Sequence, residues 1–190
     1  MLSDLPPVAL RAQKALFLDR DGVINVNHGY VFKKEEFDFI DGIFDLCRKA
    51  RKKGYAIIIV TNQSGIARGY YSERQFQSLT LWVEHQFWKK GIDILHTFHC
   101  PHHPDYSHSC CCRKPRIGML TKASQRFGID RSRSIMIGDS LSDMQCAQAA
   151  GVGKCIYLNP ALPKIKGRSP SPNSRPYYQA CNLRAASRLI

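Results

Sequence analysis

Five short runs of apolar residues recur along the chain and have the composition of β-strands. They cover residues 15–18, 56–60, 95–98, 134–137 and 155–158. Helical patterns separate these runs, and strands that alternate with helices favour a parallel sheet with helices on both faces. The pattern therefore predicts an α/β fold, a Rossmann-like three-layer sandwich with a mostly parallel sheet.

The helical patterns also indicate where helices begin and end. Apolar residues recur at helical spacing over residues 43–50, 76–87, 119–127 and 144–147. Ser72 and Gln75 have the spacing of a capping box before the second of these patterns. We expect Asp41 to open the first helix, and Gly54 and Gly128 to follow the first and third helices as left-handed caps.

The last part of the chain differs in composition from the rest. Residues 160–176 are rich in Pro, Ser, Lys and Arg and predict a loop. Residues 177–190 predict a last strand and a short helix. The length of 190 residues suits one domain, so we expect residues 1–190 to fold as a single unit.

The charge of the chain is strongly basic. Lys and Arg number 28 against 15 Asp and Glu, which gives a net charge of +13. Such an excess favours an anionic partner, whether nucleic acid, a membrane surface or a phosphorylated metabolite. The apolar runs are far shorter than the ~20 residues of a membrane-spanning helix, and the start of the chain lacks the pattern of a secretory signal. We therefore expect a cytoplasmic protein with no membrane partner.

Two carboxylates follow the first predicted strand, in the segment Asp19-Arg20-Asp21-Gly22. Residues i and i+2 of an extended segment point to the same side, and the glycine lets the chain turn sharply. Such a pair can act as nucleophile and proton-transfer group on one substrate atom, or hold a cation. A solvated Asp-Gly turn explains the segment equally well when it is considered alone.

Three further groups of polar residues fall at or near the ends of later strands. The segment that begins with Thr61 offers hydroxyl, amide and backbone N–H groups that suit a phosphoryl oxygen. Lys114 is a compact cation for phosphate. Asp139 follows the fourth strand, where it can complete a site for a hard cation with Asp19. The ordered set indicates phosphate chemistry at the carboxyl ends of the strands.

These motifs, in this order, resemble those of the haloacid dehalogenase-like (HAD) phosphohydrolases, which carry DxD, then Thr or Ser, then Lys, then an acidic pair. The resemblance implies that Asp19 attacks the phosphoryl group to form an aspartyl-phosphate, while Asp21 transfers protons. It also implies a catalytic Mg²⁺ held by Asp19, Asp21 and Asp139. The intervals between the motifs are filled by single helices and a Cys/His loop, so we expect a HAD-like fold without a cap domain.

Cysteine and histidine are concentrated in residues 100–112, which hold four of the eight cysteines. In a chain without a secretory signal, clustered thiols favour metal binding over disulfides. Alternate residues of an extended segment share a side, which pairs Cys100 with His102 and Cys110 with Cys112. Four such ligands form a tetrahedral Zn²⁺ site, and the zinc is structural because protein fills every position. The alternative is a group of reduced cysteines without metal.

The zinc-binding loop and the first motif narrow the resemblance to two HAD families, the heptose-bisphosphate 7-phosphatases and the histidinol-phosphate phosphatases. Residues 27–31, 60–69, 100–104 and 112–115 are similar to the heptose enzymes, although Ser140 stands where those enzymes usually place Lys. That likeness implies removal of the C7 phosphate from a heptose 1,7-bisphosphate, a small phosphorylated sugar. The implied substrate contacts are Asn27, His28, Gly29, Tyr30, Thr61, Asn62, Gln63, Ser64, Arg113 and Lys114.

Other functions stay open on the sequence alone. A histidinol-phosphate phosphatase or a DNA-end phosphatase uses the same chemistry, whereas a zinc-stabilised nucleic-acid-binding module leaves Asp19, Asp21 and Asp139 without a role. Asp143, one helical turn after Asp139, is expected behind the metal ligands, where it orients a metal-bound water or favours a helix N-terminus. Arg68 is expected to be a surface charge. We expect the protein to be a monomer.

Overall fold

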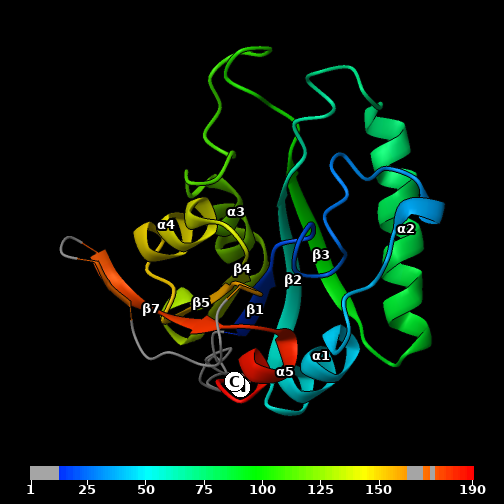
Figure 1. Ribbon diagram of the computed structural model, residues 1–190. Coiled ribbons are helices and arrows are strands. Elements are labelled where there is room, and N and C mark those ends of the chain that lie inside the picture. The colour runs from blue at the N-terminus through cyan, green and yellow to red at the C-terminus, as the bar shows by residue number, and fades with distance from the viewer. Residues whose placement is uncertain (1–12, 162–168, 172–173) are drawn as a thin grey trace, which may run out of the picture.

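A seven-stranded sheet forms the centre of the computed structural model, which describes residues 13–161, 169–171 and 174–190. The strands are β1 (Lys14–Leu18), β2 (Tyr55–Asn62), β3 (Ile94–Cys100), β4 (Ile135–Gly138), β5 (Lys154–Leu158), β6 (Ser169–Ser171) and β7 (Ser174–Ala180). They lie in the order β3-β2-β1-β4-β5-β7-β6 (Figure 1). Neighbouring strands are parallel from β3 to β7, and β6 pairs with β7 in the antiparallel sense. The predicted mostly parallel sheet is confirmed.

Helices cover both faces of the sheet. They are α1 (Ile43–Lys52), α2 (Glu73–Lys89), α3 (Gly118–Phe127), α4 (Leu141–Ala149) and α5 (Leu183–Ser187), with 3-10 turns η1 (Lys34–Glu36) and η2 (Arg131–Arg133). Side chains of α1, α2 and α5 share one apolar core with Leu16 and Leu18 of β1. Those of α3 and α4 share the other core with Phe17. Because successive strand residues point to opposite faces, one short strand contributes to both cores, and the three-layer arrangement is confirmed (Figure 1).

Most of the predicted helix ends are confirmed by the backbone. The side chain of Ser72 accepts a hydrogen bond from the Gln75 backbone, and the two residues form the capping box before α2. Gly54 and Gly128 are left-handed, with φ of 79° and 63°. The first helix differs from the prediction, because its N-cap is Gly42, at φ 87°, rather than Asp41. Glycine adopts this left-handed backbone conformation without the steric cost that a Cβ atom brings.

The predicted loop over residues 160–176 is wrong in part. Strand β6 and the first residues of β7 fall within it and pair through their backbones at the edge of the sheet. Proline is tolerated in edge strands, which explains why the composition of this segment hides them. Residues 162–168 lie outside the described part of the chain. The last strand and short helix predicted over residues 177–190 are confirmed by β7 and α5.

The connections between the motifs are short. From Asp19 to Thr61 the described chain forms η1 and α1, and from Thr61 to Lys114 it forms α2, β3 and the predicted zinc-binding loop, residues 100–112. Neither interval holds a cap domain, as predicted. Among the described residues, no helix has the length and apolar character to cross a membrane.

Candidate active site and zinc cluster

The predicted catalytic residues meet at the carboxyl edge of the sheet. Asp19 directly follows β1, Thr61 lies near the end of β2, and Asp139 directly follows β4. Because β2 and β4 are the two neighbours of β1, these side chains border one cleft of about 300 Å³. The cleft is lined by Asp19, Asp21, Asn27, Gly29, Tyr30, Thr61, Asn62, Gln63, Ser64, Tyr71, Lys114, Asp139, Ser140 and Ser142.

Lys114 is the buried cation of this cleft. Its Nζ lies 2.9 Å from Asp19 Oδ1 and 2.6 Å from Asp143 Oδ1, and it donates to the carbonyl oxygen of Val60 at 2.8 Å. Asn62 accepts from the Lys114 backbone N–H and donates to its carbonyl. The loop that carries Lys114 is therefore attached to the end of β2, and its side chain joins two carboxylates from different elements.

The site holds more negative charge than Lys114 neutralises. Burial and the nearby Asp143 raise the pKa of Asp19 to about 8, and the same two causes raise the pKa of Asp139 to about 6. Burial opposes the charged form of Lys114, yet Asp19 and Asp143 outweigh it and raise the pKa of Lys114 above its ordinary value. Three carboxylates around one ammonium group therefore favour an additional cation.

The geometry of the carboxylates fits a divalent metal ion. One oxygen each from Asp19, Asp139 and Asp143 lies within 4.8 Å of the others. Oxygen ligands of this kind suit Mg²⁺. Gly22, at φ 86°, is packed against this group, and a Cβ at its position would collide with the Asp139 carboxylate. The glycine of the first motif is thus required both by its backbone conformation and by the approach of Asp139.

Asp143 is placed more centrally than the sequence indicated. It is fully buried, and while Oδ1 faces Lys114, Oδ2 accepts from the Ser140 hydroxyl and backbone N–H at 2.7 and 3.1 Å. Ser140 and Asp143 together form the capping box of α4. The predicted relation of Asp143 to a helix N-terminus is seen. Ser140 holds one oxygen of Asp143, and Lys114 links the other oxygen to Asp19.

Asp21 is surrounded by hydrogen-bond donors. Its Oδ1 accepts from Arg20 Nη2 and Asn25 Nδ2, both at 3.0 Å. Its Oδ2 accepts from Arg20 Nε at 3.1 Å and from Gln63 Nε2 at 2.9 Å. Arg20 and Asn25 are buried and were not expected at the site. The sequence offers a signal for Arg20, which lies between the two aspartates, but none for Asn25.

The predicted substrate contacts divide into two groups. Asn27, Gly29, Tyr30 and the segment that begins with Thr61 border the cleft. His28 lies outside this lining and is half-exposed, with its Nε2 2.8 Å from Asp38 Oδ2. Arg113 also lies outside it, and its Nη1 donates to the His102 carbonyl at 3.1 Å.

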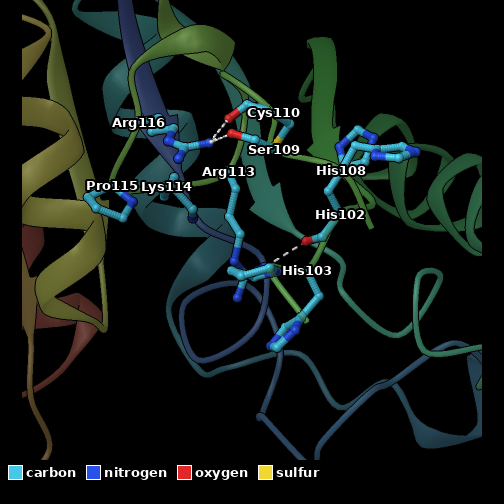
Figure 2. Close-up of a pocket in the computed structure, with 10 residues that line it drawn as sticks. His102, His103, His108, Ser109, Cys110, Arg113, Lys114, Pro115 and Arg116 are labelled. Carbon is cyan, nitrogen blue, oxygen red and sulfur yellow. Dashed lines mark hydrogen bonds between the residues drawn. The ribbon is translucent and has the colours of Figure 1, made fainter. Parts of the chain in front are cut away.

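Arg113 lines a neighbouring pocket of about 410 Å³ that Lys114 also borders. Figure 2 shows Arg113 between the His102 side of this pocket and the Lys114 side. On the other side, Arg116 donates to the Ser109 hydroxyl at 3.1 Å and to the Cys110 carbonyl. The two arginines therefore attach the segment after the predicted zinc-binding loop to the loop itself.

The predicted zinc ligands form a compact cluster. Cys100 Sγ lies 3.6 Å from both Cys110 Sγ and His102 Nδ1, and Cys112 Sγ lies 3.0 Å from Cys100 Sγ and 3.5 Å from His102 Nδ1. Zinc–sulfur bonds of ~2.3 Å in a tetrahedron place sulfur atoms ~3.8 Å apart. All four cysteines of the loop are free thiols, and Cys111 is exposed. The cluster fits a tetrahedral zinc ion bound through Nδ1 of the histidine.

The prediction that Arg68 is a surface charge is wrong. Its Nη2 lies 2.9 Å from His103 Nε2, its Nη1 donates to the Tyr106 hydroxyl at 3.2 Å, and its Nε is buried. The guanidinium also lies over the Tyr106 ring, 4.6 Å from the centroid. Arg68 thus attaches the segment after β2 to the predicted zinc-binding loop. This contact joins residues 35 and 38 positions apart in the chain, so the local sequence carried no signal for it.

The chain is similar in sequence to known hydrolases. The HAD-hydrolase-like family model matches residues 111–184. The D-glycero-beta-D-manno-heptose-1,7-bisphosphate 7-phosphatase of Yersinia pestis is 47% identical over 154 residues, which are 78% of this chain and 82% of that protein. The enzyme of the same name from Escherichia coli K12 is 46% identical over 78% of this chain and 81% of its own.

A similar fold is found among solved structures. The D,D-heptose 1,7-bisphosphate phosphatase from B. bronchiseptica, complexed with magnesium and phosphate, superposes with a TM-score of 0.76. The match covers 93% of this chain and 97% of that one at 24% sequence identity. This likeness establishes the HAD-like fold.

Proposed function

The chain belongs to the D-glycero-beta-D-manno-heptose-1,7-bisphosphate 7-phosphatase family of HAD-like hydrolases, and from this premise we propose that it hydrolyses the C7 phosphate of that heptose bisphosphate. The product is heptose 1-phosphate, a precursor for ADP- or GDP-heptose. The observation that carries the proposal is the group of Asp19, Asp139 and Asp143 around the buried Lys114, at the carboxyl edge of the sheet. This group suits phosphoryl transfer, in which charge stabilisation supplies most of the catalysis.

Asp19 is the nucleophile of the proposed reaction. Its Oδ1 is held by Lys114 Nζ and by the Arg20 backbone N–H at 2.7 Å. An oxygen of Asp19 forms a bond to phosphorus while the bond from phosphorus to the C7 oxygen breaks, and the leaving oxygen takes a proton from Asp21. Protonation matters because a sugar alkoxide is a poor leaving group.

Water completes the cycle. The carboxylate of Asp21 removes a proton from a water molecule, whose oxygen bonds to phosphorus as the bond to Asp19 breaks. Inorganic phosphate leaves, Asp19 returns as a carboxylate, and Asp21 again holds the proton that the next leaving group needs. The net change is the addition of one water across the phosphate ester.

Asp19, Asp139 and the backbone carbonyl of Asp21 are proposed to hold Mg²⁺, with Asp143 behind them. When bound, Mg²⁺ supplies positive charge next to the transferring phosphoryl group and favours the ionised form of Asp19. Thr61 and Lys114 provide a hydroxyl and an ammonium group for the phosphoryl oxygens. Asn27, Gly29, Tyr30, Asn62 and Ser64, which border the cleft, are proposed to bind the sugar.

Cys100, His102, Cys110 and Cys112 are proposed to hold a structural zinc ion. Arg113 and Lys114 follow directly, so a fixed cluster restrains the segment that supplies Lys114 to the cleft. Thiolate ligands require a reducing compartment, which supports the cytoplasm as the place of action. We also propose that the enzyme acts as a monomer.

Phosphate release tests the function. Heptose 1,7-bisphosphate, histidinol phosphate and a 3′-phosphorylated oligonucleotide are compared with and without Mg²⁺. We expect the highest kcat/KM for the heptose bisphosphate, and dependence on Mg²⁺. A preference for histidinol phosphate or for the oligonucleotide would overturn the specific assignment, and no release from any of the three would overturn the phosphatase.

A further inference from the structure

A buried tyrosine lies behind the acid/base residue, at a position to which the proposed mechanism gives no role. Tyr71 is 4% exposed, and its hydroxyl donates to Gln63 Oε1 at 2.5 Å. Its ring stacks on Phe32 with centroids 5.2 Å apart. A Cβ at Gly65 would collide with the Tyr71 ring. The ring therefore lies directly against the backbone of the segment that carries Gln63.

Both ends of the Gln63 side-chain amide form hydrogen bonds with neighbouring side chains. Its Nε2 donates to Asp21 Oδ2 at 2.9 Å and to Thr61 Oγ1 at 2.8 Å. Its Oε1 accepts from Tyr71, and its backbone N–H donates to the Cys100 carbonyl at 2.8 Å. At 2% exposure, Gln63 has little surface left for a substrate. Its side chain instead links Tyr71 to two residues of the proposed reaction.

The direction of these hydrogen bonds follows from what each group can do. In its base form the Asp21 carboxylate only accepts, so its Oδ2 requires the NH₂ side of the Gln63 amide. The other side, Oε1, also only accepts, so the Tyr71 hydroxyl must donate to it. Burial raises the pKa of Tyr71 to about 12, which keeps this hydroxyl protonated. A flipped amide would set an oxygen against the Asp21 carboxylate and an NH₂ group against the tyrosine.

We propose that Tyr71 is a positioning residue for the acid/base Asp21 and acts on it through Gln63. Its hydroxyl locks the amide in the orientation that holds Asp21 Oδ2 and leaves the Thr61 proton free for a phosphoryl oxygen. The proposal rests on the proposed function, because it assigns Asp21 the proton transfers of that reaction. Misplacing a proton-transfer group lowers the rate of the step that needs it.

Tyr71→Phe tests the proposal, because it removes the hydroxyl and keeps the ring. The purified enzyme with Mg²⁺ is assayed on heptose 1,7-bisphosphate and on p-nitrophenyl phosphate, whose phenolate leaves without a proton. The first step, which kcat/KM reports, depends on Asp21 as an acid only for the sugar. We expect kcat/KM to fall roughly tenfold or more for the sugar phosphate and about threefold or less for the aryl phosphate. The larger loss is the size expected when the Gln63 hydrogen bond to the Asp21 carboxylate is misplaced. Tyr55→Phe, at the opposite end of β2, is the control and should change neither value.

A double-mutant cycle separates positioning from packing. In a Gln63→Met background the amide is absent, so Tyr71→Phe should change kcat/KM less than about twofold. Equal losses on both substrates, or losses that add in the double variant, would overturn the role of Tyr71 while the function stands. If the wild-type enzyme releases phosphate from p-nitrophenyl phosphate but not from the heptose bisphosphate, the proposed function fails, and the assignment that rests on it fails with it.

Discussion

Replacing Lys114 by methionine removes the buried charge of the site and keeps a side chain of similar length. In the folded protein Lys114 lies between Asp19 and Asp143, at 2.9 and 2.6 Å. The substitution leaves these two carboxylates facing each other without a cation, and the carbonyl of Val60 loses its donor. We expect the metal-free protein to lose stability and the enzyme to lose activity with Mg²⁺ present.

The size of the loss follows from the geometry. The carboxylate oxygens of the site lie within 4.8 Å of one another, and two unit charges at that distance repel by about 3.5 kcal/mol at an effective dielectric constant of ~20. Removing one partner of a buried ion pair typically costs about 3–5 kcal/mol. We therefore expect the free energy of unfolding to fall by about 3–5 kcal/mol when Asp19 is ionised.

The loss depends on pH, because protonation of Asp19 relieves it. The pKa of Asp19 is raised from 3.8 to about 8 in the folded protein. A carboxyl group with a raised folded pKa contributes stability that is complete below pH ~4 and is lost as the pH rises through the folded pKa. Loss of the Lys114 charge moves that pKa still higher. The wild type and the variant therefore lose stability in parallel up to about pH 8, and the extra loss of the variant grows only above it, where Asp19 of the wild type is ionised.

Urea unfolding in EDTA at about pH 6 and about pH 9.5 measures this difference. Lys122→Met, which removes an exposed lysine of α3, is the control and should change the free energy of unfolding by less than about 0.5 kcal/mol. A loss below about 1 kcal/mol at about pH 9.5, or an equal loss at both pH values, would refute the account of Lys114 as the counter-charge of two carboxylates.

Three further substitutions test the remaining parts of the site. Asp19→Asn should abolish phosphate release and leave the melting temperature equal or higher, since it removes a repelled carboxylate; near-native turnover would contradict the covalent mechanism. Ser140→Ala should lower the free energy of unfolding by about 1 kcal/mol, measured with urea, and should lower turnover because Asp143 is held less firmly. Ser72→Ala, which breaks the capping box of α2, should cost about the same stability without a change in turnover. Equal turnover in the two variants would rule out the role of Ser140. Cys112→Ser should lower both the zinc content, measured by elemental analysis, and the melting temperature. Cys111→Ser changes an exposed neighbour and should alter neither value. A wild-type zinc content below about half an equivalent would count against a tetrahedral site.

The motifs could be placed from the sequence because each depends on neighbours in the chain. Apolar runs predicted the strands β1 to β5, and Ser72 with Gln75 predicted a cap that both residues make locally. Given a parallel sheet, the carboxyl ends of its strands share one edge. For that reason Asp19, Thr61 and Asp139 could be expected from the sequence alone to lie close together.

The chemistry of these residues was decided by the tertiary structure. Asp143 was expected behind the metal ligands, but only the folded chain brings Lys114 to it and explains the raised pKa of Asp19. Gln63 meets Asp21 across 42 positions of the chain, and the contact depends on how Tyr71 packs against the loop after β2. Strand periodicity and capping act over a few residues, whereas hydrogen-bond direction and burial depend on which loops the fold brings together. The sequence by itself thus determined which side chains are present at the carboxyl edge of the sheet, and the fold determined which of them form hydrogen bonds and ion pairs with one another.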